Sequence, residues 1–166
     1  TEDISRDGII GNYVHGNEPG HHIAYLYNAA GAPEKTQERV RMICDRMYGP
    51  DVNGLCGNDD AGQMSAWYLF SALGFYPVAP GSGWYELGSP SVARATVQLG
   101  DDRILNIETV GNAVDRFAVE AVYWNGVRIA GTRIHAKELT QGGTLKFVFQ
   151  NESKTATLKA PARHAL

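Results

Sequence analysis

The sequence has little of what marks several large classes of protein. Two of its 166 residues are cysteines, Cys44 and Cys56, and they lack the CxxC spacing typical of a zinc site. One disulfide and two buried thiols both fit this pair. No apolar run approaches the roughly 18 residues that a membrane span requires. No run of Lys or Arg occurs, and 15 basic against 18 acidic residues give a net charge of −3, so neither nucleic acid nor an anionic membrane is an expected partner.

The remaining composition is that of a globular protein. Hydrophobic residues make up 43% of the chain and charged residues 20%, a balance that excludes intrinsic disorder. The length suffices for one domain or two small lobes. Because the chain starts at Thr1 without a signal peptide, we expect it to be a piece of a longer protein.

The chain is organised around residues 55–77, where a polar, glycine-broken loop turns into an apolar helix. Asp60 stands at the position of an N-cap, and Gln63 three residues later completes a D-x-x-Q capping box. Gly74 suits the left-handed position that ends a helix, and Pro77 prevents its continuation. Apolar residues lie on nearly every face of this helix, so we expect it to be buried.

Asp60 has two interpretations. Propensity alone favours a structural cap. Its neighbours favour a functional role, because Asn58, Asp59 and Asp60 form a polar row ahead of a helix with almost no charge. A carboxylate at the mouth of a buried helix lies at the floor of a cleft, where its pKa is open to tuning.

Two further helices are predicted upstream. One runs from about Pro19 to Ala30, is apolar on most faces and ends at Gly31. The other opens at Pro33 and is amphipathic, with an inward stripe of Val40, Ile43 and Met47 and with outward Lys35, Gln37, Glu38, Arg39 and Arg41. Inner helices alternating with outer ones are what a double-layered helical barrel requires. Residues 1–14 are predicted to be an irregular lead-in.

The second half is predicted to be antiparallel β-structure, part of a two-sheet sandwich. The expected strands cover residues 84–87, 95–99, 103–108, 119–124, 127–129 and 145–149. Asn125-Gly126 between two of them suits a type I′ hairpin turn. The tail from Glu152 is expected to fray. The predicted fold is therefore α+β, with helices of a barrel in residues 1–80 and an antiparallel β region in residues 81–166.

Several long motifs resemble glycoside hydrolase family 92, the calcium-dependent exo-α-mannosidases of bacteria, many of them α-1,2-specific. The resemblance is strong over about the first ninety residues and weaker over the β region. The motifs are H-G-N-E-P at 15–19, H-H-I-A-Y-L-Y at 21–27, T-Q-E-R-V at 36–40 and G-N-D-D-A-G-Q-M-S-A-W-Y at 57–68. The resemblance implies that residues 1–80 are the last helices of a catalytic (α/α)6 barrel, followed by C-terminal strands.

The resemblance also implies an inverting mechanism. Inversion uses an acid carboxyl group and a base carboxylate roughly 6.5–9.5 Å apart, with a water molecule on the base side. The base corresponds to Asp60, with Asp59 as the fallback, and Asn58 stands where many relatives carry a second aspartate. The family motif with the general-acid glutamate, E-G-x-x-W-Q-Y, has no counterpart here, so we expect the chain alone to be inactive.

His15, Asn17 and Glu18 correspond to the family's sugar-contacting segment; without the resemblance, ordinary loop residues and a cap would explain them. The resemblance implies Ca²⁺ as cofactor, with Asn17 or Glu18 as candidate ligands and the full ligand set unassigned. His21 and His22 stay ambiguous between packing and metal binding. Trp67, Tyr68 and Trp84 are candidates for stacking on sugar, with core packing favoured for the first two.

Expected partners are a mannose-containing oligosaccharide and the upstream part of the same enzyme, and the expected location is secreted, periplasmic or at the cell surface. A second hypothesis is a non-catalytic carbohydrate-binding module built on the β half, which leaves the acidic loop at 58–60 unexplained. A third is another (α/α)6 enzyme, such as a trehalase-like hydrolase, which shares the fold but not these motifs.

Overall fold

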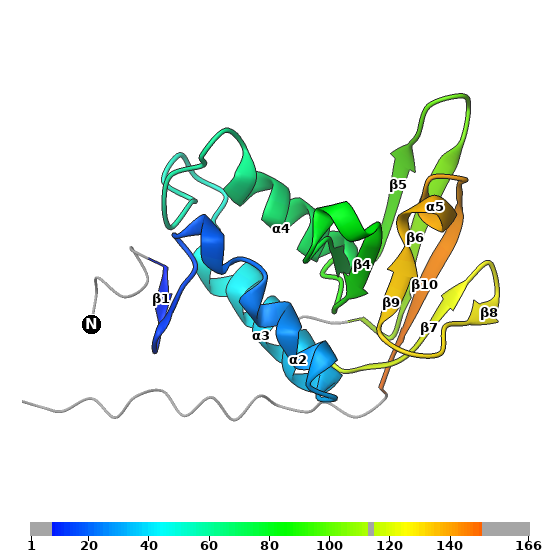
Figure 1. Cartoon of the computed structure of the whole chain (residues 1–166), viewed down its shortest axis with the longest axis horizontal. Helices are drawn as coiled ribbons and strands as arrows, with labels where there is room; N and C mark the ends of the chain where they lie inside the picture. The colour runs from blue at the N-terminus through cyan, green and yellow to red at the C-terminus, as the bar shows by residue number, and fades with distance from the viewer. Residues whose placement is uncertain (1–7, 113–114, 151–166) are drawn as a thin grey trace, which may run out of the picture.

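The computed structural model describes residues 8–112 and 115–150. Figure 1 shows a helical half, with α2, α3 and α4, beside a half built of strands. The helical elements in chain order are η1 (Glu18–Gly20), η2 (Ile23–Tyr25), α2 (Leu26–Ala29), α3 (Pro33–Met47), α4 (Gln63–Leu73), η3 (Pro80–Ser82) and α5 (Ala136–Leu139). The α+β class is confirmed, while the (α/α)6 barrel stays a prediction. None of the helices in this described part is long and apolar enough to cross a membrane.

The continuous helix predicted from Pro19 to Ala30 is wrong. Residues in this range form two 3₁₀ turns, η1 and η2, and then the short α2. The turns close by i→i−3 bonds, in which the amide of His21 donates to the Glu18 carbonyl and the amide of Tyr25 donates to that of His22. Gly20 has low helix propensity, and His21 turns its side chain inward to the carbonyl of His15. These two features break the segment into turns.

The amphipathic helix is confirmed as α3. Val40, Ile43 and Met47 are buried on one side as predicted. Arg41, which was expected to face outward, is buried instead, and its guanidinium donates to the carbonyl of Pro90 and to the side chain of Asn112. The strand half covers that side of the helix, which the periodicity of the helix alone does not reveal.

The capping box predicted at Asp60 is wrong. Helix α4 begins at Gln63 behind Gly62, and Asp60, Ala61 and Gly62 all have left-handed backbone conformations. The end at Gly74 is confirmed, with φ of 97°. The prediction that α4 is buried all round is also wrong for this chain.

Burial of α4 is one-sided. Met64 and Trp67 are fully buried, whereas Tyr68 is exposed and Leu69 is 60% exposed. The helix therefore packs on the rest of this chain with one face and presents an apolar face to the outside.

The described strands form three sheets. A hairpin pairs β1 (Ile9–Ile10) with β2 (Tyr13–Val14), a three-stranded sheet has the order β3-β4-β9, and a five-stranded sheet has the order β5-β6-β10-β7-β8. The bounds of the larger sheets are β3 (Phe75–Tyr76), β4 (Trp84–Leu87), β5 (Arg94–Gln98), β6 (Ile104–Val110), β7 (Val119–Trp124), β8 (Val127–Arg128), β9 (Arg133–His135) and β10 (Gly143–Phe149).

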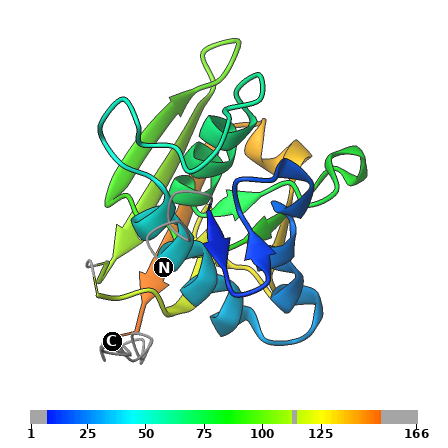
Figure 2. The same ribbon diagram turned by 90° about the vertical axis from the view of Figure 1, so that its left-hand side faces the viewer.

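Two predictions about the strands and one about the lead-in segment had different outcomes. The Asn125-Gly126 turn is confirmed, because both residues have positive φ as a type I′ turn demands. The purely antiparallel arrangement is wrong, since β10 runs parallel to β6 and antiparallel to β7. The irregular lead-in is wrong for residues 9–14, which form the hairpin seen in blue in Figure 2. Residues 1–7 and the tail from Glu152 lie outside the described residues.

Two hydrophobic cores meet at the end of α4. The helical core centres on Trp67, and the β core lies between the two larger sheets around Phe147. Phe70 of α4 packs against both cores. Gly74 sits at the junction: an added Cβ would lie 2.7 Å from the Phe147 ring and 2.9 Å from Pro90.

We therefore predict that Gly74→Ala destabilises the chain more than Gly31→Ala. Both glycines have positive φ, so both substitutions incur a left-handed strain of about 1–2 kcal/mol. Only Gly74 also faces a crowded site, which adds about 1–3 kcal/mol of overpacking, whereas Gly31 has open space. Urea unfolding of the two variants measures the difference in their free energies of unfolding. Equal losses of stability would contradict the claim that Gly74 lies in a crowded site between the two cores.

Candidate active site

Two segments distant in the sequence lie against each other at the start of α4. A Cβ added to Gly57 would lie 2.9 Å from the Cα and the carbonyl oxygen of Gly16, so the two backbones touch without intervening side chains. Figure 1 shows the loop ahead of α4 beside the segment that contains η1. The contact brings the G-N-E-P segment at 16–19 next to the G-N-D-D segment at 57–60.

The contact places Glu18 beside Asp60. The Asp60 carboxyl, when protonated, can donate a hydrogen bond to Glu18, and this bond together with the charge of Glu18 raises the pKa of Asp60 above its ordinary value. Asp60 is exposed and Glu18 is half-buried. The structure thus brings together two of the site residues predicted from sequence, one from each motif, as a solvent-facing carboxyl pair.

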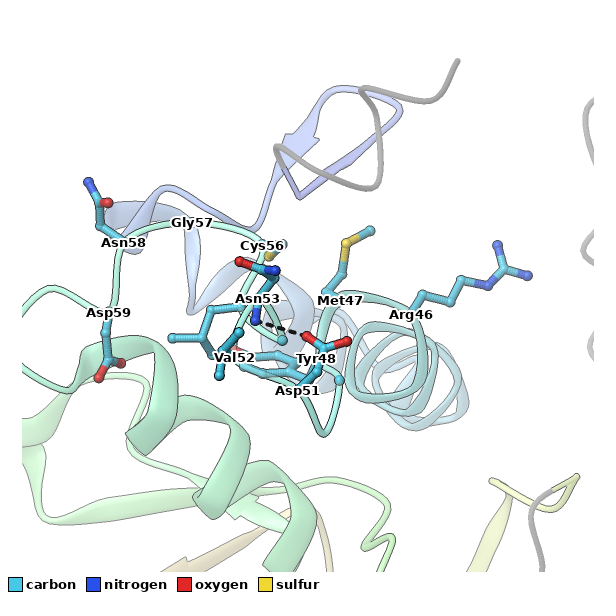
Figure 3. Close-up of a pocket in the computed structure, with 13 residues that line it drawn as sticks. Arg46, Met47, Tyr48, Asp51, Val52, Asn53, Cys56, Gly57, Asn58 and Asp59 are labelled. Atoms are coloured by element: carbon cyan, nitrogen blue, oxygen red, sulfur yellow. Dashed lines mark hydrogen bonds between the residues drawn. The ribbon is translucent and has the colours of Figure 1, made fainter.

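Asp59 and Asn58 have different surroundings from Asp60. The carboxylate of Asp59 accepts a hydrogen bond of 2.9 Å from the amide of Ser65, in the first turn of α4. Asn58 is exposed, and in Figure 3 its side chain and that of Asp59 point to opposite sides of the loop. Both residues line one end of an open hollow of about 1020 Å³, formed mainly by residues 46–57. Asn17 is exposed next to Glu18.

His15 is fully buried and makes two hydrogen bonds of 2.7 Å, to the hydroxyl groups of Tyr13 and Tyr48. The Tyr48 hydroxyl donates to the carbonyl of Met64, so it accepts from Nε2–H of His15. Nδ1 of His15 then accepts from Tyr13. Burial, with the nearby His21, lowers the pKa of His15 to about 3, so this ring is neutral at pH 7. Its role is to hold the loop in place through buried hydrogen bonds.

His21 extends the same network and is likewise buried. Its Nε2–H donates to the carbonyl of His15, and its Nδ1 accepts from the Gln63 amide. Its ring stacks on His15 with centroids 4.7 Å apart, and the Trp67 indole donates to its carbonyl. The ambiguity over His21 is thereby resolved in favour of packing, and Trp67 lies in the core rather than at a sugar-facing surface.

Sequence reasoning missed Tyr13, Tyr48 and Gln63 as supports of the site. Gln63 offered a signal, as the polar residue at the start of an otherwise apolar helix, but it was assigned to the capping box. Its amide instead bridges His21 and the Tyr76 hydroxyl. Nothing in the sequence distinguishes Tyr13 and Tyr48 from ordinary tyrosines, which bury the ring and use the hydroxyl group for a hydrogen bond.

The described residues offer oxygen donors that could form part of a cation site. Adjacent carboxyl groups on Glu18 and Asp60 are the oxygen donors that calcium prefers, and a divalent cation would relieve their repulsion. Calcium takes six to eight oxygen ligands. In residues 8–112 and 115–150, however, no group of three or more His, Cys, Asp or Glu side chains is placed to hold a metal ion. The two cysteines are free, buried thiols.

Comparison with known proteins identifies what the chain is similar to. The model of the glycosyl hydrolase family 92 catalytic domain matches residues 1–151. A family 92 α-mannosidase from Bacteroides thetaiotaomicron, solved in complex with mannoimidazole, is 41% identical with a TM-score of 0.85 over 88% of this chain and 19% of its own. A family 92 inverting mannosidase from the same organism is 39% identical with a TM-score of 0.78 over 86% of this chain and 19% of its own.

An uncharacterized secreted glycosidase of Arthroderma benhamiae is 23% identical over 143 residues, which are 84% of this chain and 18% of that protein. The chain therefore spans about a fifth of the length of the relatives it matches.

We predict that Glu18→Gln lowers the pKa of Asp60 toward that of an ordinary aspartate, because it removes the charge that opposes ionisation of Asp60. A raised folded-state pKa favours the folded state at low pH, and this stability is lost as pH rises through that pKa. Glu18→Gln should therefore stabilise the chain at neutral pH and lose that advantage in acid. Carboxyl-carbon NMR titration measures the shift, with the exposed Glu34→Gln of α3 as control. An unchanged Asp60 titration in Glu18→Gln would contradict the interaction between the Glu18 and Asp60 carboxyl groups.

We also predict that stability falls as pH drops below about 6.5, the ordinary histidine pKa. The unfolded chain takes up a proton at His15 there, whereas the folded chain resists protonation down to about pH 3. Urea unfolding at pH 7 and pH 5 checks this. His15→Asn should reduce the dependence to the part that His21 contributes, because burial also lowers the pKa of His21, while the half-buried His22→Asn should retain all of it. Identical profiles in both variants would contradict the assignment to His15.

Proposed function

The chain belongs to glycosyl hydrolase family 92, and we propose that it is part of an inverting exo-α-mannosidase. The enzyme would remove terminal α-linked mannose, with α-1,2 as the proposed linkage, from mannose oligosaccharides or N-glycans. The observation that supports this most directly is the exposed Asp60 beside Glu18, one residue from each of the two polar family motifs.

In the proposed mechanism Asp60 is the general base. Its carboxylate takes a proton from a water molecule, which attacks the anomeric carbon on the face opposite the leaving group and inverts its configuration. A base works best when its pKa lies near the working pH. A hydrogen bond from the protonated Asp60 carboxyl to Glu18, and then the charge of Glu18, raise the pKa of Asp60 and so make it a stronger base than an isolated aspartate.

The exposed Asn17 and the half-buried Glu18 are proposed to contact the hydroxyl groups of mannose, as their donors and acceptors suit a sugar ring. His15, expected to share that role, is proposed instead to position them, because its ring is buried and both ring nitrogens are bonded to tyrosines. Asn58, exposed on the same loop, remains a candidate for orienting the water molecule.

Calcium is proposed as a cofactor that polarises sugar hydroxyl groups when bound. Asn17 and Glu18 are the candidate calcium ligands of this chain, and they would account for a minority of a calcium shell. The remaining ligands are proposed to come from the sugar and from upstream parts of the enzyme.

The general acid is also proposed to lie upstream. The chain has no E-G-x-x-W-Q-Y segment and spans about a fifth of its relatives. The exposed apolar face of α4, with Leu69 at its centre, suits coverage by further barrel helices. A secreted or periplasmic location is proposed from the similarity to a secreted glycosidase.

We predict that Asp60→Asn in the full-length enzyme lowers kcat toward an aryl α-mannoside by about 10²–10⁴-fold, the usual contribution of a general base. The exposed Asp45→Asn of α3 is the matched control and should retain activity. The 166-residue chain alone should hydrolyse nothing, and removing calcium should abolish turnover by the full enzyme. Near-normal kcat in Asp60→Asn, or activity of the isolated chain, would refute the proposal.

A further inference from the structure

The turn that presents Asp60 is conformationally unusual. Asp60, Ala61 and Gly62 have φ angles of 44°, 56° and 94°, three left-handed residues in succession, of which two carry side chains. Such residues disfavour this region unless surrounding bonds impose it. Something must therefore hold the turn, and through it the direction of the Asp60 side chain.

Three backbone amides donate hydrogen bonds to Asp59 and hold this turn in place. The Asp59 carbonyl accepts from the amides of Gly62 and Met64, at 3.1 Å and 3.2 Å. Its carboxylate accepts from the amide of Ser65 at 2.9 Å. These donors belong to the end of the turn and the first turn of α4, whose amides have no partner within the helix. Asp59 thus ties the residue before the turn to the helix after it.

The same bonds separate the roles of the two aspartates. The Asp59 carboxylate is half-buried, is bonded to a backbone amide, and lies at the helix end where negative charge is favourable. The Asp60 carboxyl is exposed and interacts with Glu18. The bond through Oδ1 holds the Asp59 side chain at the start of the helix, whereas no backbone amide among the described residues holds the Asp60 carboxyl, which faces solvent.

We propose that Asp59 is a positioning residue, whose bond to the Ser65 amide sets the turn that aims Asp60 at Glu18, and that Asp59 does not itself activate water. The proposal rests on the proposed function for the role of Asp60. It excludes Asp59 as the alternative base.

Two substitutions of Asp59 distinguish positioning from catalysis. Asp59→Asn keeps an oxygen that accepts from Ser65 but cannot act as a base, whereas Asp59→Ala removes the acceptor. Asp51→Ala is a matched control, because Asp51 in the same loop region also accepts a backbone amide, that of Asn53, at 2.8 Å. Figure 3 shows that bond as a dashed line.

In the full-length enzyme, Asp59→Asn should retain kcat within a few-fold, and Asp59→Ala should lose about a hundredfold, the usual effect of a misplaced catalytic group. Asp51→Ala should behave as the parent. Equal, severe losses in Asp59→Asn and Asp59→Ala would overturn the proposal, because a base loses its function in both. If Asp59→Ala fails to fold, Asp59→Asn still decides whether Asp59 is the base, because a severe loss of kcat in that variant would overturn the proposal.

A second measurement is independent of mannosidase activity. In the 166-residue chain, the Ser65 amide should keep its protection from hydrogen exchange in Asp59→Asn and lose it in Asp59→Ala, because only the first variant keeps an acceptor for that amide. Unchanged protection of the Ser65 amide in a folded Asp59→Ala would overturn the positioning role. A failure of the proposed function alone would instead appear as a full-length enzyme that is inactive toward mannosides while the exchange rates behave as predicted.

Discussion

The close approach of Gly16 and Gly57 is the contact on which the candidate site depends. Neither residue has a side chain, so two loops that are 41 positions apart in the sequence touch backbone to backbone. Glu18 follows one glycine by two residues and Asp60 follows the other by three. The register of the two loops therefore determines whether the carboxyl groups meet, and a single added methyl group at Gly57 would separate the loops.

The polar network behind this contact keeps the two loops in place. His15 and His21 stack, each is neutral, and each ring nitrogen has a partner from a different element: the hairpin, the end of α3, the loop backbone and the start of α4. Buried polar groups are costly when unpaired, so a fully paired network favours one arrangement of these elements. The carboxyl pair lies on loops held by this buried framework, in which burial lowers the pKa of His15 to about 3.

The sequence predicts those elements whose conformation is determined by the residues within them. Helix α3 has a one-sided stripe and Pro33 at its start, and the Asn125-Gly126 turn has a specific backbone requirement, so both were predicted. The segment from Pro19 to Ala30 was mispredicted because its geometry depends on a bond from the His21 side chain to the carbonyl of His15, six residues earlier, which helix propensity does not describe. The parallel pairing of β10 with β6 and the burial of Arg41 depend on long-range packing, which local sequence patterns do not reveal. For the site, the motifs identified Glu18 and Asp60, but which aspartate bonds to the helix depended on a left-handed turn that D-x-x-Q spacing does not reveal.

The most direct test of this account substitutes Gly57 by alanine and follows the Asp60 carboxyl by NMR titration, with Gly81→Ala as control. Gly81 has open space around it and no positive φ, so its substitution should leave Asp60 unchanged. Gly57→Ala should push the two loops apart and return the pKa of Asp60 toward that of an ordinary aspartate. A folded Gly57→Ala protein in which the Asp60 pKa stays raised would contradict the claim that the glycine contact assembles the carboxyl pair.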